Sequence, residues 1–206
     1  MRIIGGAAAG LLLKAPKGYD VRPTPDLVRQ AIFNSLGPRI AGARVLDLFS
    51  GTGALGLECL SRGAAAVLSV EKSNRHATFI RQNLDFTGLP ADKYEIRVQD
   101  VFTAIGQLAS SGHDFDLIMA DPPFGEKNIG RRSNSLSQQL LDDQRLPQLL
   151  AQSGIFVLGH TKRDTLSLVD PWHEVKVLKH GDSMIRLLEK SQYASITITR
   201  TKDEDD

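Results

Sequence analysis

Two kinds of segment alternate along the chain from residue 44 onward. Short apolar runs rich in strand-forming residues lie at 44–49, 66–70, 94–98, 115–120 and 154–158. Between them, apolar residues recur at helical spacing over 54–62, 74–87, 101–109 and 137–152. This alternation predicts parallel strands joined by crossover helices. Several of the runs are apolar at nearly every position, which is typical of strands covered by helices on both faces.

The two ends of the chain depart from this pattern. Runs at 174–179 and 184–189 are separated by the turn sequence HGDS, which predicts an antiparallel hairpin at one edge of the sheet. An amphipathic helix is predicted over 26–36. We therefore expect an α/β fold with a seven-stranded, mostly parallel sheet and helices on both faces. Its expected parts are an N-terminal extension (1–43), a main domain (44–190) and a C-terminal extension with an acidic tail (191–206).

Composition narrows the class of protein. The chain has 206 residues, of which 41% are hydrophobic and 24% charged, as in one compact soluble domain. No run approaches about 18 apolar residues and no secretory signal begins the chain, so we expect a cytoplasmic protein without a membrane partner. One cysteine and five scattered histidines predict neither a disulfide nor a metal site. A monomer is expected.

A glycine-rich segment follows the first predicted strand. Gly51, Gly53 and Gly56 match the pattern G-x-G-x-x-G, and Glu71 lies 20 residues after the first of them, where a ribose-binding carboxylate is expected. A tight turn, a close backbone approach and an acidic group suit any adenosine-containing ligand. The motif therefore predicts such a ligand more firmly than it predicts NAD.

Further carboxylates bear on the choice of ligand. Asp47 lies on the first predicted strand, four residues before Gly51, and Asp100 ends the third strand as Glu71 ends the second. A carboxylate at the top of the first strand repels a pyrophosphate but favours the cationic methionine end of S-adenosylmethionine. This charge argument favours S-adenosylmethionine.

The tetrapeptide Asp121-Pro122-Pro123-Phe124 follows the fourth predicted strand. Two consecutive prolines make a stiff, extended backbone, which fixes the Asp121 carboxylate and the Pro122 carbonyl as an array of acceptors. The exocyclic amine of a nucleobase is a suitable donor for such an array. Phe124 is placed to stack on the base, which must be unpaired or flipped out to reach it.

These segments carry a family resemblance. LDLFSGTGALGLE, VEKS, QDVF and ADPPF resemble the S-adenosylmethionine-dependent methyltransferases that have the amine-methylating motif [DNS]-PP-[YFW]. More narrowly, RIIGG (2–6), KAPKG (14–18), RPTPDLVRQAIFNSL (22–36) and GALGLECLSRGA (53–64) resemble the RsmD-like family, whose members methylate guanine N2 in 16S ribosomal RNA. The resemblance covers about residues 1–190.

The resemblance implies a Rossmann-like class I methyltransferase fold, S-adenosylmethionine as cofactor and no metal. It implies 16S rRNA as partner, within a small ribosomal subunit or an assembly intermediate. The implied cofactor pocket consists of Asp47, Phe49, Gly51 and Gly53, with Glu71 on the ribose, Asp100 and Val101 beside the adenine, and the segment from Arg22 to Thr24 closing over the methionine. Asp121, Pro122, Pro123 and Phe124 are implied to hold the guanine amine.

Other functions stay open at this point. DPPF suits any planar NH₂ group, so adenine N6 in DNA or RNA and a glutamine side-chain amide are alternative substrates. An NAD-dependent oxidoreductase could use the same glycine motif. A non-catalytic RNA-binding module is the remaining alternative.

The net charge of the whole chain does not indicate a nucleic-acid substrate, but the separate charges of its two ends do. The formal net charge is +1, which by itself favours a small-molecule enzyme. Residues 1–44, however, contain seven basic and two acidic residues, and residues 203–206 are all acidic. We therefore interpret the chain as a moderately basic enzyme with an acidic extension, and expect its basic N-terminal segment to contact RNA.

Overall fold

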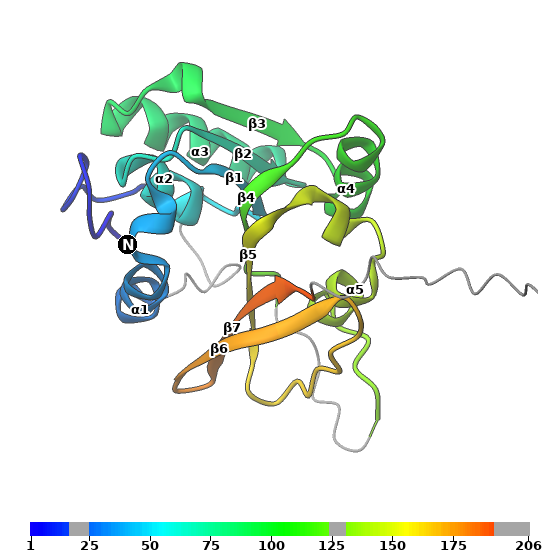
Figure 1. Cartoon of the computed structure of the whole chain (residues 1–206). Coiled ribbons are helices and arrows are strands. Elements are labelled where there is room, and N and C mark those ends of the chain that lie inside the picture. Colours follow the sequence, from blue (N-terminus) through cyan, green and yellow to red (C-terminus); the bar gives the residue numbers. More distant parts are fainter. Residues whose placement is uncertain (17–24, 124–130, 192–206) are drawn as a thin grey trace, which may run out of the picture.

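A seven-stranded mixed sheet forms the centre of the computed structural model, which describes residues 1–16, 25–123 and 131–191 (Figure 1). The strands are β1 (Arg44–Leu48), β2 (Ala66–Glu71), β3 (Tyr94–Val98), β4 (Phe115–Ala120), β5 (Leu150–Thr161), β6 (Trp172–His180) and β7 (Ser183–Lys190). Their order in the sheet is β3-β2-β1-β4-β5-β7-β6. Strands β1 to β5 pair in parallel, whereas β7 is antiparallel to both β5 and β6. The predicted sheet and terminal hairpin are confirmed.

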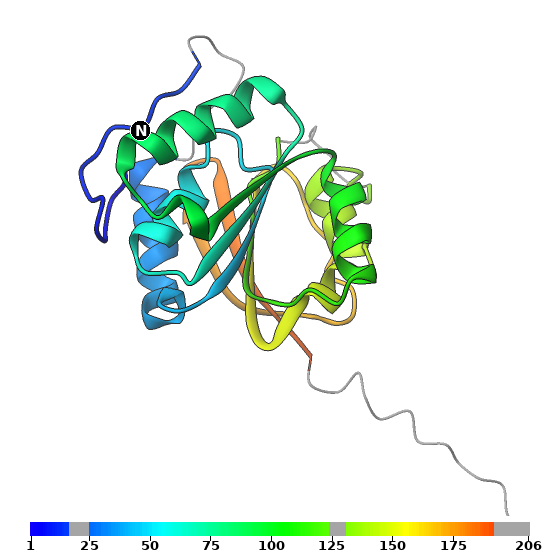
Figure 2. The same ribbon diagram turned by 90° about the horizontal axis from the view of Figure 1, so that it is seen from above.

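Helices cover both faces of the sheet. One face carries α1 (Asp26–Leu36), α2 (Ala54–Ser61) and α3 (Asn74–Thr87), and the other carries α4 (Val101–Ser110) and α5 (Leu136–Asp142). In Figure 2 the sheet is the middle layer, with the first three helices to its left and the last two to its right. Short 3-10 turns lie at Gly37–Ile40, Ala91–Lys93 and Leu146–Leu149.

The strands separate two hydrophobic clusters because successive side chains point to opposite faces. On β4, Leu117 and Met119 face α1 and α2, whereas Ile118 and Ala120 face α4 and α5. All four are at most 2% exposed. This two-sided burial is the reason that the strand sequences are almost continuously apolar.

One predicted helix differs from the structure. The pattern over 137–152 predicts a single long helix, but α5 ends at Asp142 and β5 begins at Leu150. Asp143 has an extended backbone, and Pro147 occupies the short 3-10 turn between the two elements. Proline lacks the N–H that would continue a helix, and the apolar residues around it are instead buried under the sheet.

The first 16 residues form hydrogen bonds with side chains of α2 and α3. The buried Glu58 carboxylate accepts the N–H groups of Ile4 and Gly5 at 2.7 and 2.8 Å, and Ser61 Oγ accepts the N–H of Ala8 at 2.9 Å. Ile3 is fully buried in the same cluster as the helices of that face. This part of the N-terminal extension therefore shares the core of the main domain.

No helix within the described ranges is long and apolar enough to span a bilayer.

Candidate active site

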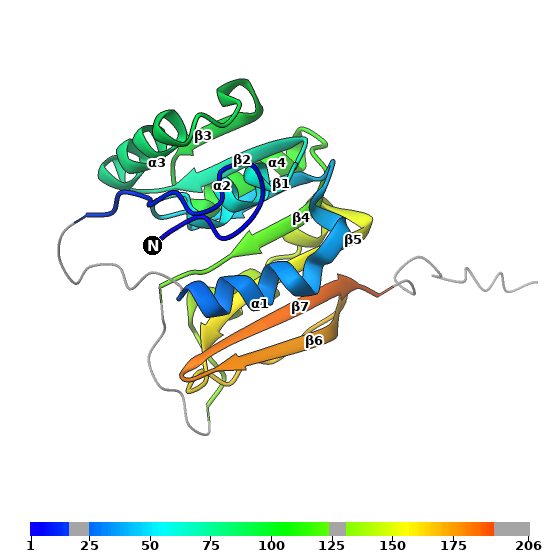
Figure 3. The same ribbon diagram turned by 90° about the vertical axis from the view of Figure 1, so that its left-hand side faces the viewer.

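The predicted site residues gather at one edge of the sheet, where β1, β2, β3 and β4 all end. In Figure 3 this is the left-hand edge, toward which the parallel strands point. The order of the strands reverses here, because β2 lies on one side of β1 and β4 on the other. In open α/β sheets the crevice at such a switch point is the usual ligand site.

The loop between β1 and α2 makes a sharp turn. Phe49, Gly51 and Gly53 have φ angles of 56°, 56° and 82°, in the left-handed region that glycine adopts readily and phenylalanine rarely. A side chain added at Gly51 would meet no atom within 4 Å, so the loop backbone borders open space there. Such a loop offers a ligand close access to backbone atoms, as the glycine motif predicts.

Two side chains, from β1 and from β3 on the far side of β2, fill the space beneath this loop. A Cβ added at Gly56 would lie 2.5 Å from the Tyr94 hydroxyl and 3.0 Å from Asp47 Oδ2. The Tyr94 hydroxyl in turn lies 2.6 Å from Ser69 Oγ, and both residues are buried. Gly56 therefore permits the close packing of the first turn of α2 onto Tyr94. The sequence offers only one signal for this contact, a serine within the apolar run of β2.

Asp47 is almost completely buried at the base of the loop, with 1% of its surface exposed. Its Oδ2 accepts the N–H of Gly56 at 3.1 Å, whereas its Oδ1 has no hydrogen-bond partner in the described structure. Burial raises the pKa of this carboxyl to about 7, and the like charges of Glu71 and Asp121 add to the effect. The three carboxylates therefore belong to one electrostatic site.

Glu71, at the end of β2, connects the glycine loop to the start of α3. One of its oxygens accepts the N–H of Gly51 and the other accepts the N–H of Ser73, both at 2.8 Å. A carboxylate has about four lone-pair positions. Glu71 therefore keeps acceptor capacity for ribose hydroxyls while it holds the loop.

Asp100 and Val101 lie where β3 leads into α4. Asp100 caps this helix, because its Oδ1 accepts the N–H groups of Phe102 and Thr103 at 3.0 and 3.3 Å. Its side chain is 46% exposed, and Val101 is buried beside it. The cap fixes one carboxylate oxygen, and the other, Oδ2, lies 4.0 Å from Lys72 Nζ.

Asp121 leaves the end of β4 and packs against β5. A Cβ added at Gly159 would lie 2.4 Å from Asp121 Oδ1, so only glycine leaves room for this carboxylate. The Ser137 hydroxyl on α5 donates to the Gly159 carbonyl at 3.1 Å. Pro122 is buried and Pro123 is exposed. Sequence reasoning missed Gly159, which carries no recognisable motif.

Three predicted site residues, Arg22, Thr24 and Phe124, lie outside the described residues. Among the residues that the structure does describe, no group of three His, Cys, Asp or Glu side chains could hold a metal ion.

The residues at this edge fit a cationic adenosine ligand. Asp47, Glu71, Asp100 and Asp121 supply carboxylates, and no described residue donates to the buried Asp47 Oδ1. An anionic pyrophosphate would be repelled by this set, whereas a sulfonium and an ammonium group would be attracted.

The strand order, the glycine loop after β1 and the Asp-Pro-Pro segment after β4 define the Rossmann-like class I methyltransferase fold. A solved structure described as "Putative methyltransferase yhhF from Escherichia coli" has a TM-score of 0.73 and 30% sequence identity, over 93% of this chain and 98% of that one. Within this class, the chain belongs to the RsmD-like family: the family model "Conserved hypothetical protein 95" matches residues 1–189.

Two related sequences illustrate the relationship. The "Putative rRNA methyltransferase YlbH" of Bacillus subtilis is 34% identical over 162 residues, which cover 79% of this chain and 83% of that protein. The "Ribosomal RNA small subunit methyltransferase D" of Escherichia coli K12 is 39% identical over 124 residues, 60% of each chain.

Proposed function

We propose that this protein transfers a methyl group from S-adenosylmethionine to the exocyclic N2 amine of a guanine in 16S ribosomal RNA. The proposal depends above all on two motifs that lie at the same edge of the sheet. These are the glycine loop after β1 and the Asp-Pro-Pro segment after β4. The names of the Bacillus and Escherichia relatives support rRNA as the substrate.

The residue roles follow from position and chemistry. We assign cofactor binding to Asp47, Phe49, Gly51, Gly53, Glu71, Asp100 and Val101, together with Arg22 and Thr24 of the preceding segment. Asp121, Pro122, Pro123 and Phe124 are assigned to the guanine. The assignments of Arg22, Thr24 and Phe124 rest on the sequence alone.

S-adenosylmethionine, when bound, supplies an electrophilic methyl group on a positively charged sulfur. The protein's own part is alignment, which can contribute about 7–11 kcal/mol to lowering a barrier. Asp121 and the Pro122 carbonyl accept the two hydrogens of the amine and so orient the nitrogen lone pair. Asp121 is also the carboxylate that we assign to take up the proton that the nitrogen loses. The nitrogen forms its bond to the methyl carbon as the bond between that carbon and sulfur breaks, which leaves S-adenosylhomocysteine.

The test is methylation of small-subunit particles from a strain that lacks the gene, with labelled cofactor and nucleoside mapping of the product. The wild type should yield N2-methylguanosine. Asp121→Ala should lose turnover while its affinity for S-adenosylmethionine, measured by calorimetry, stays unchanged. A fully active Asp121→Ala enzyme, or N6-methyladenosine as the product, would contradict the proposal.

We further propose that the enzyme acts as a monomer in the cytoplasm, on an assembled small subunit or an assembly intermediate. The proposed parts are an N-terminal extension (1–43), the methyltransferase domain (44–190) and a C-terminal extension (191–206). Comparing naked 16S rRNA with particles as substrate, and measuring the mass in solution, tests these points.

A further inference from the structure

We propose that the RNA strand flanking the target guanine binds across a basic surface on β5, β6 and the turns that follow them. This surface, called the basic flank below, consists of Lys162, Arg163, Lys179 and His180. The inference rests on the proposed function and adds which side of the site holds the RNA backbone.

The order of the strands places the basic flank beside the Asp-Pro-Pro segment that follows β4. Lys162 and Arg163 directly follow β5, the neighbour of β4, whose end carries Asp121. His180 pairs with Ser183 and Thr161 pairs with Ser183, so the tip of the β6–β7 hairpin lies at the same edge. Adjacent strands lie about 5 Å apart, so the tip is displaced sideways from β4 by roughly 10–15 Å. It also lies about 10 Å further along the strand direction, because β5 continues for three residues beyond Leu158, the partner of the last β4 residue.

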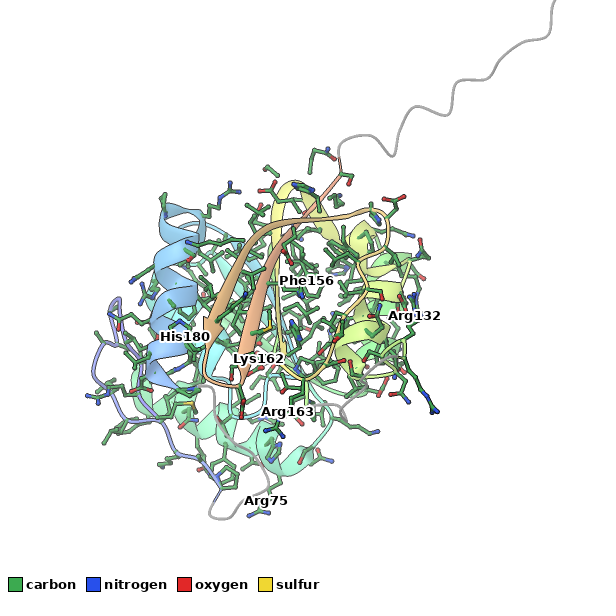
Figure 4. All side chains as sticks on the ribbon, turned by 90° about the horizontal axis from the view of Figure 1, so that it is seen from below. Arg75, Arg132, Phe156, Lys162, Arg163 and His180 are labelled. Atoms are coloured by element: carbon green, nitrogen blue, oxygen red, sulfur yellow. The ribbon has the colours of Figure 1, made fainter. Side chains whose placement is uncertain are left out.

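Figure 4 shows where the side chains of this region lie. Lys162, Arg163 and His180 lie in the lower half of the view, whereas Phe156, from the middle of β5, lies nearer its centre and is fully buried. Arg75, at the start of α3, is also drawn toward the lower side. Cations therefore lie at the carboxyl edge of the sheet together with the carboxylates of the site.

The lysines and arginine of the basic flank are available for phosphates. Lys162, Arg163 and Lys179 are exposed, and none forms an ion pair with any described residue. The acidic neighbour Asp164 is buried, with 2% of its surface exposed, so it does not cover them. Asp182 in the hairpin turn is the exposed acidic residue of this tip.

The backbone beneath these cations is held in place. The N–H of Lys162 donates to the Asp182 carbonyl at 2.7 Å, which joins the end of β5 to the hairpin turn. The N–H of Asp164 donates to the Thr161 carbonyl at 3.0 Å, and His160 Nδ1 lies 3.1 Å from the Asp164 carbonyl. A fixed arrangement of cations lowers the entropy cost of binding a phosphate backbone.

Most described cations of the N-terminal segment are, by contrast, already engaged. Arg29 is fully buried and pairs with Asp26 at 2.8 Å, and Asp26 also pairs with Arg2. Arg39 lies 3.7 Å from Glu189, and Arg44, at the opposite edge of the sheet, lies over the ring of Phe115. The charge excess of residues 1–44 therefore does not provide a phosphate-binding surface by itself.

This arrangement predicts on which side of the site the RNA backbone lies. The residues assigned to the cofactor lie at the ends of β1, β2 and β3. The Asp-Pro-Pro segment follows β4, and the basic flank lies at the ends of β5, β7 and β6. A guanine turned into the site at β4 leaves its neighbouring phosphates over the basic flank, away from the carboxylates that would repel them.

The double variant Lys162→Ala/Arg163→Ala tests this surface against a matched control, Arg81→Ala/Lys93→Ala. The control also removes two exposed cations without ion pairs among the described residues, from α3 and the turn before β3. Methylation of small-subunit particles and of a 16S fragment is measured with varied RNA and salt. The flank variant should raise KM for RNA several-fold with kcat and cofactor affinity unchanged.

RNA binding by the flank variant should also depend less on salt. The slope of the logarithm of the association constant against the logarithm of the salt concentration should become shallower by roughly 1 for each phosphate that is no longer neutralised. Equal KM and salt slopes for the flank variant, the control and the wild type would overturn the inference while leaving methylation intact. Failure of the wild type to methylate any RNA would instead refute the proposed function.

Discussion

Asp47 is the residue whose burial has the clearest measurable consequence. Its pKa in the folded chain is about 7, above its ordinary value of 3.8, because burial disfavours the charged carboxylate. The folded chain therefore holds an extra proton between about pH 4 and pH 7. The stability that this proton provides is complete below the lower value and is lost as the pH rises through 7.

Asp47→Asn should remove this loss. The asparagine keeps an acceptor for the Gly56 N–H but carries no charge to be buried. We expect the free energy of unfolding at pH 8 to rise by up to the order of 4 kcal/mol in the cofactor-free chain, with little change at pH 4. Urea denaturation at several pH values measures this difference. An unchanged pH slope in the variant would assign the titration to another group.

Gly159 makes a second prediction at the scale of the residue. Gly159→Ala places a methyl group only 2.4 Å from the present position of Asp121 Oδ1. The carboxylate must move, and a displacement of about 1 Å in a catalytic group can cost on the order of 100-fold in rate. We expect kcat to fall to that extent with cofactor affinity retained.

Gly154→Ala is the matched control for this change. It lies on the same strand, where its added carbon would meet a Leu150 side-chain carbon at 2.8 Å and the Asp116 carbonyl at 3.0 Å. This variant should lose stability in thermal unfolding but keep its kcat. Equal loss of kcat in both variants would mean that general strain in β5, and not the position of Asp121, is responsible.

Between elements, Asn83 on α3 ties the N-terminal segment to the glycine loop. Its side chain donates to the carbonyls of Thr52 and Lys14, both at 3.0 Å, and accepts the N–H of Lys14 at 2.7 Å. The residue is fully buried. It therefore connects the glycine loop to the segment that leads toward Arg22 and Thr24.

Asn83→Ala leaves these three backbone groups without their partner. A buried polar group without a partner costs about 1–3 kcal/mol. We expect a lower melting temperature, faster hydrogen exchange at Lys14 and a higher Kd for S-adenosylmethionine. Thr78→Ala, on the exposed side of the same helix, should change none of these quantities. Weakened cofactor binding in both variants would assign the effect to the helix as a whole.

The success of the sequence predictions at this scale depends on local signals. Helix α3 is predicted to the residue, because Ser73 caps its start and Gly88, with φ of 65°, ends it. The terminal hairpin is predicted because Gly181 adopts a positive φ in a two-residue turn. The position of α5 is less well predicted, since apolar residues on either side of Pro147 continue the helical spacing into β5.

Long-range contacts explain what the sequence did not predict in the site. Spacing alone placed Asp47, Glu71 and Asp121 at one edge, but not the hydrogen bonds by which the first two hold the glycine loop. Tyr94 and Gly159 act through contacts with residues far away in the chain, which leave no periodic pattern. Such contacts become visible only when the strands are assembled.

At the scale of the whole molecule, a count of charges does not show where a polyanion binds. Residues 1–44 hold the largest basic excess, yet Arg29 is buried and Arg39 faces Glu189. A count of composition does not single out Lys162 and Arg163, but they are exposed directly after β5, the strand next to β4 and Asp121. Pairing and position therefore decide which cations RNA can reach.

The acidic end of the chain provides the last test of this view. Truncation after Ser191 removes two basic and four acidic residues and changes the formal net charge from +1 to +3. If the basic flank binds the RNA, removal of this negative charge should leave RNA affinity unchanged or raised at low salt. The difference should vanish at high salt, where the screening length falls to about 3 Å at 1 M. Fluorescence anisotropy with a 16S fragment measures both conditions, and a marked loss of affinity on truncation would show that residues 192–206 contribute favourable contacts of their own.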